Sequence, residues 1–236
     1  MAQYYGTNIV IDGLVLCLDA SDKLSYPGSG TTWTDLVGSD NLTNSGGASF
    51  NSAQGGFITY DGTDGMGKIS AGFSFNGNNE GTIAAWVKYS SSDGYIGVFQ
   101  NNANKWISVR PGSTYMGIYD YYPNGSRAIG SASTTAINDG VWHYIVRSKT
   151  NGSTADKLYA DGITQTYSIG DGALADQWFT DYTAGNLEFL IGPRWANGAY
   201  GGFWGGSIAA LHVYNRPLSQ EEVIQNFNAQ RGRFGV

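Results

Sequence analysis

The chain has 236 residues and a formal net charge of −6, from 13 Lys and Arg against 19 Asp and Glu. Glycine, at 35 residues, and tyrosine, at 16, are abundant, which is typical of short strands joined by tight turns and not of a helical protein. The lack of a basic stripe argues against nucleic acid as a partner. No apolar run is long enough to span a membrane, so we expect no membrane contact. The length of the chain favours one all-β domain.

Apolar runs separated by turn residues predict the strands of the N-terminal half. Residues 1–8 are expected to form an arm before strands at 9–11 and 14–18, where the single cysteine, Cys17, is expected to be a buried and inert thiol. Long loops are expected from residue 19 to residue 56. The remaining predicted strands of this half cover residues 57–60, 82–89, 95–100, 105–110 and 115–119.

The second half continues with strands and one hairpin. A strand is predicted from Trp142, and this side chain and Trp86 are expected to be buried because their neighbours are apolar. Asp161 and Gly162 favour positive φ, which predicts a two-residue type I′ turn between strands at 158–160 and 163–167. A long excursion over residues 170–186 then precedes a strand at 187–191.

The last strand and the helix that follows carry the clearest local signals. Residues 207–214 are small or apolar on both alternating faces, so this strand is expected in the middle of a sheet. Ser219 and Glu222 have the spacing of a capping box. The helix is expected to run to about Ala229, to stop at Gly232 and to dock on the sheet, leaving residues 231–236 as a tail.

Several of these stretches together resemble a known family. Three stretches are similar to parts of laminin-G-like jelly-roll domains. The closing strand and helix of such domains resemble residues 206–223 (GSIAALHVYNRPLSQEEV). Their Trp-His strand resembles residues 141–146 (VWHYIV), and their L-Y-x-D-G hairpin resembles residues 157–162 (KLYADG). These domains belong to the concanavalin-A-like lectin and glucanase group. Residues 13–38 are similar to openings of such domains in tailed-bacteriophage structural proteins. The resemblance implies a two-sheet antiparallel jelly-roll sandwich over residues 9–230, with one short C-terminal helix.

The carboxylates lack the pattern of the glucanase branch of that group, which places paired carboxylates in an E-x-D-x-x-E arrangement. None of the four glutamates has an aspartate two residues later: Glu80, Glu188, Glu221 and Glu222. His143 and His212 lie inside predicted strands, where a structural role is favoured, and no nucleophile elbow or zinc motif is present. We therefore expect that the protein is not an enzyme.

Calcium is the one ion that the sequence suggests, and no cofactor is required. The resemblance implies a calcium site at the rim of the sandwich, and Asp61 and Asp64 could supply two oxygen ligands there. Both aspartates precede a glycine in the sequence YDGTDG. Turn formation by these Asp-Gly pairs is therefore the competing interpretation.

Two aromatic stretches, both predicted as loops, are candidates for a binding surface. Their residues are Tyr119, Asp120, Tyr121 and Tyr122 in the first stretch, and Arg194, Trp195, Asn197, Tyr200 and Trp204 in the second. Aromatic rings with amide and carboxylate partners suit a sugar. The same residue types are favoured at protein interfaces, so core packing, partner contact and glycan contact all remain open.

The resemblance and the missing catalytic carboxylates favour a non-catalytic structural protein on the exterior of a tailed-phage virion, as a head decoration or a short fibre. Residues 1–16 lack the charged start and apolar run of a signal peptide, which agrees with a virion location. The expected partners are other virion proteins, of the capsid or a fibre, and host-surface glycans; a homo-oligomer is compatible. The alternatives are a carbohydrate-binding adhesion module and, third, a polysaccharide hydrolase or lyase. Either chain end could anchor the domain or pack back on it.

Overall fold

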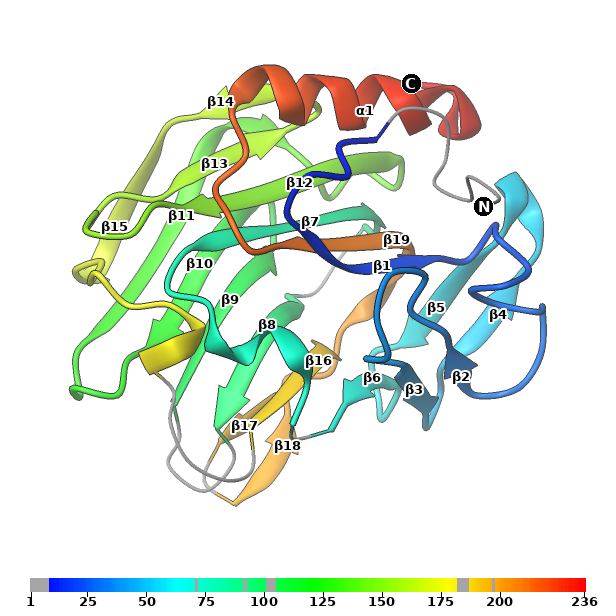
Figure 1. The fold of residues 1–236 in the computed structure, drawn as a ribbon, viewed down its shortest axis with the longest axis horizontal. Coiled ribbons are helices and arrows are strands. Elements are labelled where there is room, and N and C mark those ends of the chain that lie inside the picture. The colour runs from blue at the N-terminus through cyan, green and yellow to red at the C-terminus, as the bar shows by residue number, and fades with distance from the viewer. Residues whose placement is uncertain (1–8, 71, 91–92, 101–104, 182–186, 197) are drawn as a thin grey trace.

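Two antiparallel β-sheets pack face to face, and an α-helix lies across the outer face of one of them (Figure 1). The computed structural model describes residues 9–70, 72–90, 93–100, 105–181, 187–196 and 198–236. The expected N-terminal arm, residues 1–8, lies outside the described residues. In the part of the chain that is described, no helix is long and apolar enough to cross a membrane.

The first sheet has eight strands, with β19 near its centre. In spatial order its strands are β14 (Ile163–Gln165), β13 (Lys157–Ala160), β12 (Trp142–Lys149), β7 (Gly81–Lys88), β19 (Gly205–Tyr214), β5 (Phe57–Asp61) and β4 (Ser49–Asn51), with β1 (Leu14–Asp19) also paired to β19. β7 pairs along one edge of β19, while β5 and β1 share the other edge. The central position predicted for residues 207–214 is thus confirmed.

The second sheet has nine strands. In spatial order they are β15 (Tyr167–Gly172), β11 (Arg127–Ala136), β10 (Tyr115–Tyr121), β9 (Lys105–Pro111), β8 (Tyr95–Gln100), β16 (Leu187–Gly192), β6 (Met66–Ile69), β3 (Leu42–Ser45) and β2 (Thr32–Trp33). A separate hairpin of β17 (Arg194–Ala196) and β18 (Ala199–Gly201) follows β16. Three 3₁₀ helices, η1 (Ala53–Gly55), η2 (Ser74–Gly77) and η3 (Phe179–Asp181), complete the described elements besides α1.

Alternate residues of β7 face two different apolar layers. Ile83 and Val87 belong to the core between the sheets, whereas Trp86 belongs to a second layer beneath the helix. Trp86 and Trp142 are 0% and 2% exposed, as expected from their apolar neighbours. The eight-stranded sheet is therefore apolar on both faces because both faces are covered.

The helix α1 (Gln220–Phe234) begins as its sequence predicts but ends later. The capping box is present: Ser219 Oγ accepts from the amide of Glu222, and the Glu222 side chain accepts from the amide of Ser219. The helix runs to Phe234 and is capped by Gly235, whose φ of 75° is left-handed, so the predicted stop at Gly232 is wrong and residues 231–234 of the predicted tail are helical. Phe234 packs 4.3 Å from Trp86 between ring centroids, and this burial outweighs the roughly 1 kcal/mol cost of a glycine inside the helix.

Other boundaries differ where the pattern is weak. Residues 9–11 form no strand; the amide of Val10 instead donates to Asn226 Oδ1 of α1 at 2.7 Å. The region predicted as loops between residues 19 and 56 contains the short strands β2, β3 and β4, and β11 was not predicted. The predicted turn is confirmed, since Asp161 and Gly162 have φ values of 54° and 79°.

Candidate binding face

The outer face of the nine-stranded sheet carries a row of aromatic side chains. We define the aromatic face by the residues that cluster here or join it from the hairpin β17–β18: Tyr95, Phe99, Trp106, Tyr119, Tyr121, Leu190, Arg194, Trp195 and Tyr200. Phe99 and Leu190 form a fully buried floor. Tyr119 and Tyr121 of β10 are only partly buried, so the upper layer of this cluster is accessible.

Strand pairing sets the positions of these rings. Because β10 pairs with β9 and Tyr121 stands opposite Trp106, residues two apart on β10 flank the same tryptophan. The Trp106 ring lies 5.4 Å from Tyr119, edge to face, and 5.5 Å from Tyr121. Tyr95 of β8 adds a ring 5.8 Å from Tyr119. Rings fixed on adjacent strands form a preorganised surface.

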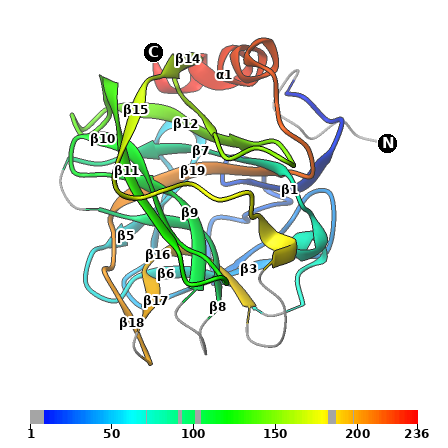
Figure 2. The same cartoon turned by 90° about the vertical axis from the view of Figure 1, so that its left-hand side faces the viewer.

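The hairpin β17–β18 brings the second aromatic stretch to the first. The Arg194 guanidinium lies 5.4 Å from the centroid of Tyr119 and 5.6 Å from that of Trp106, and Nη1 donates to the Tyr119 hydroxyl at 3.4 Å. Trp195 and Tyr200 pack edge to face at 4.7 Å. Figures 1 and 2 show this hairpin on the side of the molecule away from α1. Two stretches distant in sequence therefore share one surface.

Polar groups border the aromatic face. Glu188 of β16 accepts from the Tyr200 hydroxyl at 2.6 Å with one oxygen and lies 3.5 Å from Lys68 Nζ with the other. Burial and the neighbouring Glu188 carboxylate raise the pKa of Tyr200. Lys105 Nζ lies 4.8 Å from the Tyr121 centroid. The face thus combines rings for stacking with a carboxylate and cations that can bond hydroxyl groups.

Three of the candidate residues are interior and do not belong to this surface. Asp120, Tyr122 and Trp204 are each 0% exposed. β10 extends the predicted strand by two residues to Tyr121, and Arg194 and Tyr200 lie in the short strands β17 and β18 and not in a loop. Alternation along β10 points Asp120 to the face opposite its neighbours Tyr119 and Tyr121. Asn197, the remaining member of the second stretch, lies outside the described residues.

Asp120 takes part in a buried ion cluster that joins the two sheets. Arg147 of β12 donates from Nη1 and Nη2 to the two oxygens of Asp120 at 2.8 and 2.6 Å, and from Nε to Asp156 at 2.6 Å. The Tyr122 hydroxyl also donates to Asp120, at 2.9 Å. Burial raises the pKa of Asp156, against the lowering effect of Arg147. These groups link β12 to β10 across the core and have no access to solvent.

Asp61 and Asp64, the suggested calcium ligands, stabilise turns. Asp61 Oδ1 accepts from the amides of Thr63, Asp64 and Gly65 at 2.9, 3.2 and 3.0 Å, and bonds of this kind lower its pKa. Asp64 Oδ1 accepts from the amide of Gly47 at 2.8 Å. Among the described residues, no group of three or more His, Cys, Asp or Glu side chains could hold a metal ion. The geometry fits the turn interpretation.

Both histidines lie inside strands, as predicted, but neither ring nitrogen of His212 has a hydrogen-bond partner among the described residues. His143 lies between Asp161, 2.7 Å from Nδ1, and Asp139, 3.1 Å from Nε2. His212 is fully buried beside Cys17 on the paired strand β1. Burial lowers the pKa of His212 to about 4 and raises that of the Cys17 thiol.

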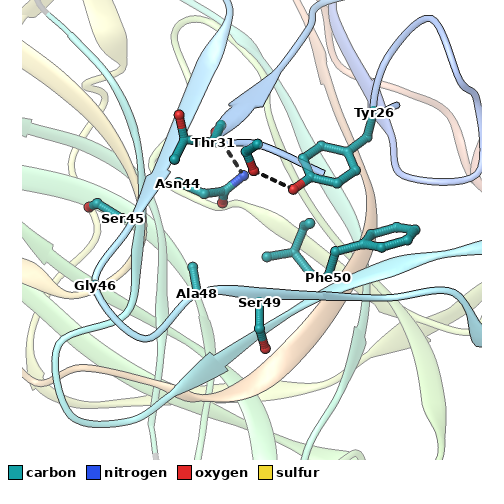
Figure 3. A pocket seen from close by; sticks show the side chains of 10 residues that line it. Tyr26, Thr31, Asn44, Ser45, Gly46, Ala48, Ser49 and Phe50 are labelled. Atoms are coloured by element: carbon teal, nitrogen blue, oxygen red, sulfur yellow. Dashed lines mark hydrogen bonds between the residues drawn. The ribbon is translucent and has the colours of Figure 1, made fainter. Parts of the chain in front are cut away.

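A pocket that the sequence did not suggest lies between β3 and β4 (Figure 3). It has a volume of about 170 Å³ and is lined by the rings of Tyr26 and Phe50 together with Asn44 and small polar residues. Tyr26 donates to the carbonyl of Gly30 at 2.5 Å, and Asn44 Nδ2 donates to that of Thr31 at 3.4 Å. These lining donors are thus satisfied by neighbouring backbone, which makes the pocket a weaker candidate than the aromatic face.

Comparison with solved structures shows the same fold at low sequence identity. The binding domain of Paraclostridial mosquitocidal protein 1 has a TM-score of 0.63 at 16% identity, and the botulinum neurotoxin serotype D binding domain has 0.63 at 13%. The alignments include 92% and 93% of this chain, respectively, and 52% of each of the two binding domains. Trypanosoma rangeli sialidase, in complex with 2,3-difluorosialic acid, gives 0.63 at 15% identity, with 94% of this chain covering 33% of that one. The chain thus spans about half or less of these proteins.

Sequence comparison supplies the family. No curated protein matches the chain. Residues 61–224 match the model of a laminin G family that is described as the concanavalin A-like lectin/glucanases superfamily. The matched region includes β12 with Trp142 and the hairpin β13–β14, two of the stretches that resemble the family, and it covers most of the sandwich. The chain belongs to the concanavalin A-like lectin/glucanases superfamily.

Proposed function

We propose that the protein is a non-catalytic glycan-binding domain whose ligand lies on the aromatic face. The observation that carries the proposal is the meeting of Tyr119 and Tyr121 of β10 with Arg194 and Tyr200 of the hairpin on one accessible surface. Ligand sites combine aromatic side chains with a few polar groups that fix orientation. Here the rings can stack on a sugar, and Arg194 and Glu188 can bond its hydroxyl groups.

The carboxylates support a non-catalytic role. A glycosidase needs two carboxyl groups on either side of a scissile bond, one of them with a raised pKa. Among the described carboxyl groups, the one with a raised pKa is Asp156, which is enclosed in the core. Glu188 and Glu222 are bonded to Lys68 and Arg216. None of these arrangements offers an acid and a nucleophile facing a common ligand.

The comparisons support binding over chemistry in a limited way. The family includes lectins by its description, and two of the similar structures are named as binding domains. At such low sequence identity these structures show only a shared fold, because one fold hosts many functions. The argument for a glycan therefore rests on the side chains of the aromatic face.

The proposal includes a location on the exterior of a tailed-phage virion, as a head decoration or a short fibre that contacts host-surface glycans. Its support is the similarity of residues 13–38 to openings of tailed-phage structural domains. Mass spectrometry of purified particles tests the location. The expected result is the protein in virions; production during infection without incorporation would refute it, leaving an adhesion module as the alternative.

A glycan array with matched variants tests the binding site. The wild-type protein and Phe50→Ala, which alters the pocket between β3 and β4, should bind the same glycans. The double variant Tyr119→Ala/Tyr121→Ala should lose that binding while keeping its melting temperature within a few degrees. Because Asp61 and Asp64 are occupied by turn amides, chelation of calcium should leave binding unchanged. Loss of binding only in Phe50→Ala, or a blank array for the wild-type protein, would overturn the proposal.

A further inference from the structure

The balance of charge on the aromatic face points to the chemical class of the ligand. Building on the proposed glycan-binding function, we infer that the bound sugar carries an anionic group, a carboxylate or a sulfate, which Arg194 and Lys105 engage. The chain as a whole is acidic, with a net charge of −6. A local excess of positive charge on such a chain is unexpected unless it serves a partner.

Among the described residues, no acidic side chain pairs with Arg194 of the face or with Lys105 at its border. Arg194 contacts the rings of Trp106 and Tyr119 and the Tyr119 hydroxyl. Lys105 lies against the Tyr121 ring. Within the described residues, neither side chain forms an ion pair with an acidic group. Both positive charges are therefore available to a ligand.

The acids nearby are already neutralised. Glu188 is shared between Lys68 Nζ at 3.5 Å and the Tyr200 hydroxyl at 2.6 Å. Asp93, two residues before the start of β8, is paired with Arg110 of β9. The opposite charges within each of these pairs cancel, so Arg194 and Lys105 give this surface a net positive charge.

The geometry of Arg194 suits an anion held beside a stacked sugar. Two aromatic rings hold its guanidinium in place. One hydrogen bond goes to the Tyr119 hydroxyl, and the other N–H groups of the guanidinium can donate to a ligand. A planar guanidinium can donate two parallel hydrogen bonds to a carboxylate or to two sulfate oxygens. Partial burial of Arg194 reduces the screening of such a contact by salt.

The test compares three trisaccharides by calorimetric titration: trigalacturonate, its carboxyl-reduced neutral form and a sulfated form of the neutral sugar. The acidic sugars should bind roughly tenfold or more tightly than the neutral one, as a charge-assisted hydrogen bond provides. Arg194→Gln and, separately, Lys105→Gln should each remove much of this preference. Raising the salt from about 0.1 M to about 1 M should weaken acidic binding more than neutral binding.

The control is Lys23→Gln, which changes the net charge equally but lies beside Phe50 near the pocket between β3 and β4. It should keep the full acidic preference. Lys105 lies on β9, so the effect of Lys105→Gln does not depend on the position of the hairpin that carries Arg194. Equal binding of neutral and acidic sugars, or loss of preference in Lys23→Gln, would overturn the inference while leaving the glycan-binding function intact. Failure of all three sugars and of a full array would instead refute the proposed function itself.

Discussion

The outer faces of the two sheets carry similar aromatic residues but differ in what covers them. On the eight-stranded sheet, Trp86 is stacked on Phe227, lies 4.3 Å from Phe234 and donates through Nε1 to Gln230 Oε1 at 2.8 Å. All three partners belong to α1, a helix of 15 residues. On the nine-stranded sheet, two strands of three residues each form the hairpin β17–β18, and partly buried Tyr119 and Tyr121 remain beside it.

The difference separates structural aromatics from candidate binding aromatics. Beneath α1 the Nε1 of Trp86 donates to Gln230 of the helix, so this ring is bonded within the chain. On the aromatic face the rings contact Arg194 and Lys105, for which the described residues supply no ion pair. A surface of rings and unpaired charges gains most from a ligand, whereas a surface closed by a helix contributes to folding. The following predictions test this distinction.

The largest effect on stability should come from Trp86→Ala. Loss of a fully buried tryptophan should lower the free energy of unfolding by about 3–5 kcal/mol. The matched variant is Trp195→Ala on the aromatic face, where the ring is partly exposed and the loss should be about 1 kcal/mol. Urea unfolding of both variants measures this difference. Equal losses would show that the two faces contribute alike to folding.

Acid should weaken the covered face through His212. Burial lowers its pKa to about 4 in the folded protein, against about 6.5 when unfolded, so the unfolded chain binds the extra proton first. The stabilisation is therefore complete above pH 6.5 and falls by about 3 kcal/mol as the pH approaches 4. Unfolding measured between pH 7 and 4 should show a shallower fall in His212→Leu than in wild type. An unchanged slope would contradict this role.

His143 should act in the opposite direction. Burial lowers its pKa, but the bonds to Asp161 and Asp139 raise it more, so the net shift is upward. Its stabilisation is present below the unfolded pKa and is lost as the pH rises through the folded one. His143→Gln should therefore lose more stability at pH 5.5 than at pH 8. A loss that is equal at both pH values would show that the charged form is not favoured.

A smaller effect should come from the start of α1. Ser219→Ala removes one half of the capping box and should lower the free energy of unfolding by about 1 kcal/mol. Gln220→Ala, at the next and exposed position, serves as the control and should be nearly neutral. Because α1 lies away from the aromatic face, glycan affinity should be unchanged in both variants. Reduced affinity in Ser219→Ala would show that the two faces are coupled.

The smallest change in stability should accompany the largest change in binding. Tyr121→Ala removes a partly buried ring that contacts Trp106 and Lys105, and the free energy of unfolding should fall by about 1 kcal/mol or less. Glycan affinity should fall at least tenfold, because loss of an aromatic anchor costs about 1.4 kcal/mol or more. Thermal unfolding and titration of one preparation give both values. A stable variant with full affinity would place the ligand elsewhere.

Local patterns predicted the parts of the fold that carry strong signals. The two-faced apolar strand β19, the capping box of Ser219 and the Asp161-Gly162 turn are all as expected. β11 was missed because its sequence RAIGSASTTA is small and polar. Its place depends on close packing, since a side chain at Gly130 would lie 2.6 Å from the Ser168 carbonyl oxygen of β15. Such pairing is a long-range property that no local pattern contains.

The candidate site was predictable in composition but not in orientation. Tyr119, Tyr121, Arg194 and Tyr200 were singled out from sequence, yet their meeting depends on the position of the hairpin beside β8 and β10. The strand predicted over residues 115–119 stopped one residue before Asp120, so the alternation that turns Asp120 into the core was not recognised. Trp106, at the centre of the face, lies in a predicted strand and had no local signal of its own.

The most direct test of the account is a map of amide chemical-shift changes on titration of the ¹⁵N-labelled protein with the tightest glycan of the array. The account predicts that the largest changes fall on β9, β10 and the hairpin β17–β18, with α1 and the eight-stranded sheet unaffected. Changes concentrated on α1, or around Tyr26 and Phe50 in the pocket between β3 and β4, would contradict the claim that the uncovered aromatic face is the binding surface.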